Sequence, residues 1–160
     1  MNSSAIAGSV WTPDTNVDRP PSWVDTATGF LNGVDEDFLS VIGEVTKKTA
    51  LSTVSDSGGS VETNERFFLP SRSEVYGGDE VTGGEGVAYP YYSNNSDLGS
   101  AGTGNDSNRI KYSDGSVWYW WLRSPYVDTA NSVRFVFTTG RINNTSANGN
   151  YGVAPICCIV

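Results

Sequence analysis

The chain has 160 residues and no histidine, so every candidate site lacks the commonest general base and metal ligand. Its formal net charge of -8 at pH 7 would repel phosphates, which excludes nucleic acid and anionic membrane surfaces as partners. No apolar stretch is long enough to span a bilayer, and the N-terminus lacks the pattern of a signal peptide. The length predicts a single domain over residues 1–160.

The N-terminal third predicts short, separate elements. Residues 1–23 are polar and interrupted by prolines, so we expect coil or one short strand. Apolar residues at helical spacing, with acidic residues before them, predict a short helix over residues 34–42. Alternation predicts an edge strand over residues 44–52. A loop over 56–63 and a brief apolar strand over 66–69 follow.

The middle of the chain carries one clear helix signal and one long polar segment. Ser71 and Glu74 have the spacing of a capping box, which predicts a short helix through Tyr76 that ends at Gly77. Residues 79–108 are rich in Gly, Ser, Asn and Asp around a cluster of tyrosines. A loop of this length in one domain is typically functional, and its tyrosines need burial or a partner.

The C-terminal third predicts strands and tight turns. An Asp-Gly pair at 114–115 predicts a hairpin between strands at 111–112 and 116–122. A second hairpin is predicted over residues 133–142, and the apolar run over residues 152–160 predicts a buried closing strand. These short runs bounded by turn residues favour a loop-rich α+β fold.

Aromatic residues are concentrated at the start of this third. Three of the five tryptophans lie between residues 118 and 121, so Trp121 and its neighbours are predicted to anchor the core. A period of two places Phe135 and Phe137 on one face of a strand and Val136 on the other. If Val136 faces the core, both phenylalanine rings face outward.

Residues 126–151 are rich in Asn, Ser, Thr, Gly and Tyr, which is the composition of adaptable binding surfaces. Plain loops have the same composition, and the sequence leaves both interpretations open. The adjacent Cys157 and Cys158 should point to opposite faces of a strand, which is poor geometry for a disulfide. We expect them to be small buried hydrophobic residues.

A spaced pattern of residues extends over most of the chain. It comprises the blocks 35–39, 68–77, 89–92 and 121–125, followed by Ala130, Val133, Arg134, Gly140, Ala147, Gly152, Val153, Pro155 and Cys157. In this pattern the chain resembles the C-type-lectin-fold variable proteins that retroelements diversify in phages and bacteria. Those proteins are similar in fold to formylglycine-generating enzymes.

The resemblance implies an α+β C-type lectin fold that is loop-rich, with short helices and a small twisted antiparallel sheet. It implies a hypervariable protein that binds a ligand or receptor through a variable region at about residues 118–160. The expected partner is a protein or glycan receptor on a host or neighbouring cell. The expected location is a phage tail or a bacterial cell surface, and oligomerisation is left open.

The resemblance also divides the C-terminal third into scaffold and binding positions. The implied scaffold is Trp120, Trp121, Leu122, Arg123, Pro125, Val133, Val136, Gly140, Gly152, Val153 and Pro155. The binding positions hold Asn or residues reachable from its codons by adenine mutagenesis. They are Tyr126, Val127, Asp128, Thr129, Asn131, Ser132, Phe135, Phe137, Asn143, Asn144, Thr145, Ser146, Asn148, Asn150 and Tyr151.

Two other functions remain open. One is a structural phage-tail or cell-surface module that binds nothing selectively, and the other is a degenerate enzyme related to formylglycine-generating enzymes. Those enzymes need two cysteines that jointly hold copper, whereas the two cysteines here are adjacent. We therefore predict no catalytic residues, no metal ligands and no cofactor.

Overall fold

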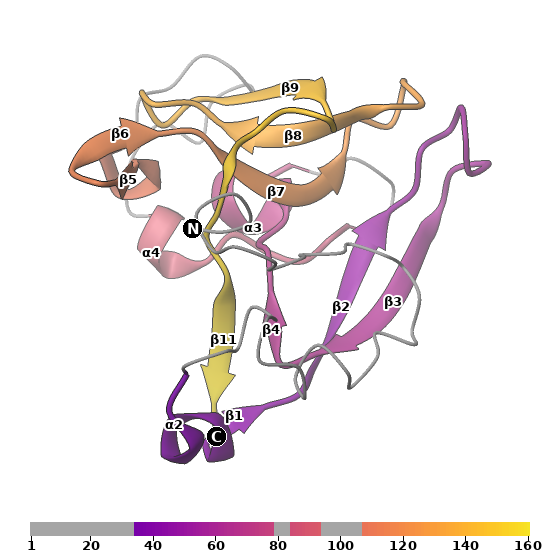
Figure 1. The fold of residues 1–160 in the computed structure, drawn as a ribbon. Helices are drawn as coiled ribbons and strands as arrows, with labels where there is room; N and C mark the ends of the chain where they lie inside the picture. The colour runs from indigo at the N-terminus through magenta and orange to yellow at the C-terminus, as the bar shows by residue number, and fades with distance from the viewer. Residues whose placement is uncertain (1–33, 79–83, 94–106) are drawn as a thin grey trace.

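The computed structural model describes residues 34–78, 84–93 and 107–160 (Figure 1). The coil predicted over residues 1–23 lies outside the described residues, as does most of the long segment predicted as a loop. The described chain is a mixed α+β structure of short helices and several small sheets, as predicted. Within it, no helix is long and apolar enough to cross a membrane.

The first helix is shorter than predicted. α2 spans Glu36–Ser40, and the Asp35 side chain caps it by accepting a 3.1 Å hydrogen bond from the amide of Phe38. The prediction of a helix over residues 34–42 is wrong at its end, because Ile42 is paired in a strand.

Strands from distant parts of the chain form a three-stranded sheet. β1 (Ile42–Gly43) and β4 (Phe67–Phe68) both pair antiparallel with β11 (Ile156–Ile159), which lies between them. The closing strand predicted over residues 152–160 is therefore split. Its first part, β10 (Gly152–Val153), belongs to a different sheet.

A two-stranded sheet forms one side of the molecule (Figure 1). β2 (Val45–Ala50) pairs antiparallel with β3 (Ser60–Glu65) over their full lengths. The strand predicted over residues 44–52 is confirmed, whereas the loop predicted over 56–63 is wrong in its second half. β3 has a single apolar residue, Val61, and pairs with β2 along its length, so it lacks the apolar alternation that predicts a strand.

The predicted capping box is confirmed at α3 (Arg72–Tyr76). The Ser71 hydroxyl accepts from the amide of Glu74 at 3.1 Å, and the Glu74 carboxylate accepts from the amide of Ser71 at 2.8 Å. Gly77 ends the helix with a φ of 75°, a conformation that favours glycine.

The segment predicted as a long loop contains two helical turns among its described residues. These are α4 (Pro90–Ser93) and the 3₁₀ turn η1 (Ser107–Arg109). Tyr92 in α4 is buried in the core, so one tyrosine of the predicted cluster has the burial that it was expected to need.

The predicted Asp-Gly hairpin is confirmed. β5 (Lys111–Ser113) and β6 (Ser116–Trp118) pair around Asp114 and Gly115, which have φ values of 50° and 78°. The predicted strand over 116–122 breaks after β6, and its remainder belongs to the main sheet.

The main sheet has four strands in the order β10-β7-β8-β9. β7 (Trp120–Pro125), β8 (Ser132–Val136) and β9 (Ile142–Ser146) pair antiparallel, which confirms the hairpin predicted over residues 133–142. β10 runs parallel to β7, so this sheet is mixed and not purely antiparallel as predicted. β8 and β9 lie at the end of the domain opposite α2 and the C-terminus (Figure 1).

The core lies between the inner face of this sheet and the helices α3 and α4. Its buried residues are Val75, Tyr76, Tyr92, Trp120, Leu122, Val136 and Ile142. Cys157 and Cys158 are free but only half-buried, so the expectation of two buried cysteines is wrong. Burial and the neighbouring Cys158 raise the pKa of the Cys157 thiol above its usual value.

Candidate functional site

The outer face of the main sheet carries a cluster of five rings, which we call the aromatic face: Tyr119, Trp121, Phe135, Phe137 and Tyr151. Trp121 and Phe135 are register partners on β7 and β8, and their ring centroids lie 6.3 Å apart. Tyr151 lies 4.7 Å from Trp121 and 4.9 Å from Phe135. Tyr119 stacks on Tyr151 at 5.0 Å and meets Phe137 edge-on at 4.9 Å.

The alternation predicted in β8 is confirmed, because Val136 is fully buried in the core and Phe135 lies on the outer face. The expectation that Phe135 is exposed is wrong. Its side chain is only 4% exposed, since the rings of Trp121 and Tyr151 lie against it. The aromatic face is therefore a packed layer in which Phe135 is buried and the other four rings are partly exposed.

The connection between β9 and β10 lies directly on this layer. A Cβ atom added to Gly149 would lie 3.3 Å from the Trp121 ring, so a side chain there would press on the indole. The amide of Ala147 donates to the carbonyl of Asn131 at 2.9 Å, which joins this connection to the one between β7 and β8. The two connections are thus held together above the aromatic face.

The fifteen predicted binding residues come from β8, β9 and the three connections around them. Five are exposed: Asp128, Asn131, Asn143, Asn148 and Asn150. Eight are partly exposed: Tyr126, Thr129, Ser132, Phe137, Asn144, Thr145, Ser146 and Tyr151. The structure brings these thirteen to one sheet and its loops.

The other two predicted binding residues are buried. Phe135 is covered by other rings of the aromatic face, and Val127 is 9% exposed. The Val127 carbonyl accepts hydrogen bonds from both the amide and the hydroxyl of Thr53, each at 2.8 Å. The Val127 carbonyl therefore links the end of the main sheet to the loop after β2 by hydrogen bonds, and the Val127 side chain is not presented to solvent.

Sequence reasoning missed two members of the aromatic face as surface residues. The sequence predicts no role for Tyr119 and places Trp121 in the core, whereas both rings lie on the outer face of the sheet. The signal was available, because a period of two that buries Trp120 and Leu122 necessarily places Tyr119 and Trp121 on the opposite face.

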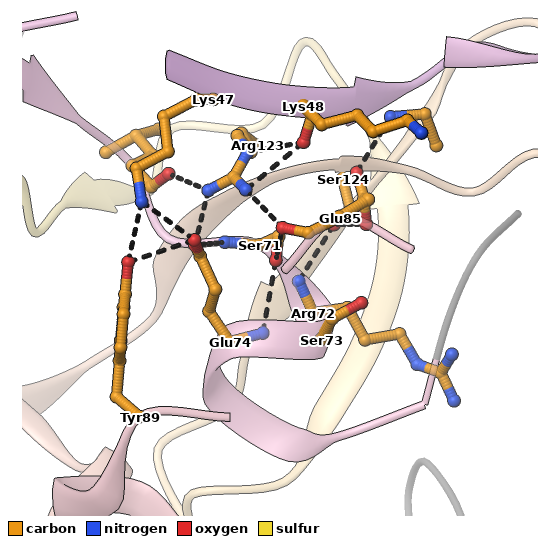
Figure 2. Close-up of polar contacts among 12 residues, drawn as sticks. Lys47, Lys48, Ser71, Arg72, Ser73, Glu74, Glu85, Tyr89, Arg123 and Ser124 are labelled. Atoms are coloured by element: carbon orange, nitrogen blue, oxygen red, sulfur yellow. Dashed lines mark hydrogen bonds and ion pairs between the residues drawn. The ribbon is translucent and has the colours of Figure 1, made fainter. Parts of the chain in front are cut away.

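Beneath the sheet, a buried polar network joins β2, α3 and β7 (Figure 2). The Glu74 carboxylate is its centre, and its side chain is 4% exposed. Lys47 forms an ion pair with it at 3.0 Å, Arg123 forms a second ion pair, and the Tyr89 hydroxyl donates to it at 2.9 Å. Two cations and one phenol thus contact a carboxylate that the fold has removed from water.

Arg123 connects this centre to three backbone segments. Its guanidinium donates to the carbonyls of Leu69 at 2.9 Å, Glu85 at 2.6 Å and Lys48 at 3.2 and 3.3 Å. A planar guanidinium with five donors is suited to this task, and lysine could not replace it.

Glu85 forms the second half of the network. Its carboxylate accepts from the amide of Ala50 at 2.9 Å and from the hydroxyl of Ser124. The Ser124 hydroxyl in turn accepts from the amide of Arg72 at 2.8 Å. Residues Trp120 to Ser124 therefore contribute two core side chains, one surface ring and two network residues.

The ionisation of the network follows from these contacts. Burial by itself would raise the pKa of Glu74, but the hydrogen bond and charge of Arg123, with Ser71 and Lys47, hold that pKa below its ordinary value of 4.5. Burial and the negative charge of Glu74 raise the pKa of Tyr89 well above its usual range. The network therefore pairs a carboxylate with a protonated phenol and two cations, and its acids are engaged in structural hydrogen bonds.

This ionisation predicts an acid-sensitive fold. Because the pKa of Glu74 is lower in the folded state, its stabilisation is present above about pH 4.5 and is lost as pH falls through the folded-state pKa. Urea unfolding from about pH 5 to about pH 3 should show a free energy of unfolding that falls by up to about 1.4 kcal/mol per pH unit from this group. The Glu74→Gln variant should be less stable at pH 7 and show a shallower slope, whereas equal slopes would contradict the assignment.

Among the described residues, no group of three or more His, Cys, Asp or Glu side chains could hold a metal ion. The chemistry that the surface offers is instead contact through partly exposed rings and hydrogen bonding through the surrounding amide and hydroxyl side chains. That combination is suited to recognising another molecule.

No curated protein and no solved structure matches the chain. A family model described as a domain of unknown function, DUF6273, matches residues 16–160. The match covers nearly the whole chain, which therefore belongs to the DUF6273 family.

Proposed function

We propose that this protein displays a diversified binding surface on a C-type-lectin-like scaffold, as a variable protein of a diversity-generating retroelement. The surface is the outer face of the main sheet with the connections around β8 and β9. Its partner is a protein or glycan receptor on a host or neighbouring cell. The setting is a phage tail or a bacterial cell surface.

One observation carries this proposal. Thirteen of the fifteen residues singled out as variable are exposed or partly exposed on one sheet and its loops. Inward-facing positions of the same sheet, such as Trp120, Leu122 and Val136, are buried in the core. Substitution at the first set changes the surface, while the second set keeps the packing.

The position of the sheet supports the same proposal. β8 and β9 lie at one end of the domain, and the paired strands β1 and β11 lie at the other (Figure 1). A domain held by the β11 end would present the variable surface outward. The aromatic face supplies rigid rings, and the surrounding polar side chains supply adaptable hydrogen bonds. Antibody binding sites combine the same two kinds of residue.

The test is to sequence the gene in many isolates of one lineage and compare the changes with any neighbouring template copy. We expect substitutions at the thirteen accessible positions, fewer at the buried Val127 and Phe135, and almost none at Trp120, Leu122 and Val136. Glu62 and Asn64 on β3 serve as the matched control, because they are exposed but lie outside the variable surface.

Two outcomes would contradict the proposal. If Glu62 and Asn64 change as often as Asn143 and Asn148, exposure alone explains the variation and the structural-module alternative is favoured. If changes are spread evenly over surface and core, no directed diversification has acted on this sheet.

A further inference from the structure

A second surface feature lies beside the aromatic face. A cleft with a volume of about 170 Å³ opens between the β5–β6 hairpin and residues 152–155. Lys111 and Tyr112 line it from β5, and Trp118 and Tyr119 line it from the end of the hairpin. None of the fifteen predicted binding residues contributes to the cleft, so its chemistry would stay fixed while the neighbouring surface varies.

Lys111 lines this cleft and supplies a positive charge to it. Its ammonium group lies 5.6 Å from the ring centroid of Tyr91, 5.9 Å from that of Tyr92 and 6.0 Å from that of Trp120. No described carboxylate forms an ion pair with it. Burial lowers the pKa of Lys111, which reflects an ammonium group poorly compensated for lost hydration. A ligand carboxylate would supply that compensation.

The walls of the cleft present aromatic surface to solvent. Trp118 is 41% exposed, and it is the register partner of Lys111, so the two side chains lie on the same face of the hairpin. Tyr112 is 65% exposed on the opposite face. Trp118 meets Tyr119 edge-on with a centroid distance of 6.1 Å, which fixes its orientation. Exposed rings of this kind contact the flat face of another ring at little entropic cost.

The volume of the cleft limits the size of its occupant. This is well above the ~10 to 15 Å³ that a single water molecule needs, so there is room for one small ring and its substituents. An extended peptide or an oligosaccharide could place only one unit there.

From these features we propose that the cleft binds a carboxylate carried on a six-membered ring, with the carboxylate at Lys111 and the ring against Trp118. The ring is either a sugar, as in a uronic acid, or an aromatic acid. Lys111 selects for the charge, and the exposed Trp118 ring selects for a ligand ring that can stack on it. This site is separate from the variable surface. The cleft proposal can therefore fail while the proposed function holds, and the proposed function can fail while the cleft proposal holds.

The test uses the full chain and two matched pairs of probes, glucuronate with glucose and benzoate with benzyl alcohol. Titration followed by tryptophan fluorescence and by calorimetry should detect one of the two acids and not its neutral counterpart. The acid that binds identifies the source of the ring. Lys111→Met should weaken that binding about tenfold or more, because it removes a charge-assisted hydrogen bond.

Arg141→Met is the matched control, since it removes one positive charge from an exposed residue outside the cleft. It should change affinity by less than about twofold. Trp118→Ala removes an exposed ring and should also weaken binding, so it tests the site even if Lys111→Met fails to fold. Binding of neither acid, equal binding of an acid and its neutral partner, or equal loss in Lys111→Met and Arg141→Met would overturn the proposal.

Discussion

Replacing Arg123 by methionine should lower the free energy of unfolding by about 3 to 5 kcal/mol. The arginine side chain is 10% exposed and forms an ion pair with a carboxylate that is 4% exposed. Methionine fills a similar volume but donates no hydrogen bonds. The carbonyls of Leu69, Lys48 and Glu85 would lose the guanidinium donor, and Glu74 would keep only one of its two cations.

Urea unfolding at pH 7, followed by circular dichroism, measures this effect. Arg141→Met is again the control, because Arg141 is exposed, and it should change the free energy of unfolding by at most about 0.5 kcal/mol. The double variant Arg123→Met with Glu74→Gln should be less destabilised than the sum of the single variants, since it removes both charges of the pair. A loss below about 1 kcal/mol in Arg123→Met would contradict the central role of this network.

The network also marks the limit of what the sequence could predict. The capping box of Ser71 and Glu74 was predicted because its two partners lie three residues apart. The same Glu74 also binds Lys47 and Arg123, which are 27 and 49 residues away in the chain. No local pattern contains those distances, so the helix cap was predictable and its second function as the centre of a buried network was not.

The wrong helix end and the missed strand have the same cause. Ile42 has the spacing of a helical residue, but its pairing with Ile159 in β11 makes it a strand residue. β3 has only one apolar residue and gains its structure from pairing with β2. In both cases a distant partner decides the local conformation, and tertiary context overrides propensity.

The sequence predicted which residues lie on the candidate surface but not how deeply each of them is buried. Alternation correctly separated Val136 from Phe135 and Phe137, because the period of a strand is fixed. The burial of Phe135 depends on Tyr151, which arrives from the connection after β9. A single strand can reveal which face a residue occupies, but the coverage of that face is set by other segments.

Truncating Trp120 to alanine should cost about 3 to 5 kcal/mol, because its side chain is 2% exposed in the centre of the core. Its indole nitrogen also donates to the carbonyl of Arg109 at 2.8 Å. Arg109 is itself fully buried, so the variant would leave a cavity and a buried carbonyl without that donor.

The three tryptophans between residues 118 and 121 allow the cost of truncation to be compared at three levels of burial within one segment. Trp118→Ala should cost at most about 0.5 kcal/mol, because that ring is 41% exposed on the β5–β6 hairpin. Trp121→Ala should fall between the two, at about 1 to 2 kcal/mol, since it loses contacts with Phe135 and Tyr151 but leaves the core intact. Urea unfolding of the three variants under one condition ranks them directly.

The rank of Trp121 decides how the aromatic face should be understood. The sequence predicts it as a core residue, while the structure places it on the outer face of the sheet. If Trp121→Ala is as costly as Trp120→Ala, the five rings form a second core and the connections above them cannot vary freely. If Trp121→Ala is much less costly, the rings form a surface layer, a platform whose members can be replaced while the domain still folds. Only a platform of this kind would let ring positions such as Tyr151 and Phe137 change from one copy of the protein to the next.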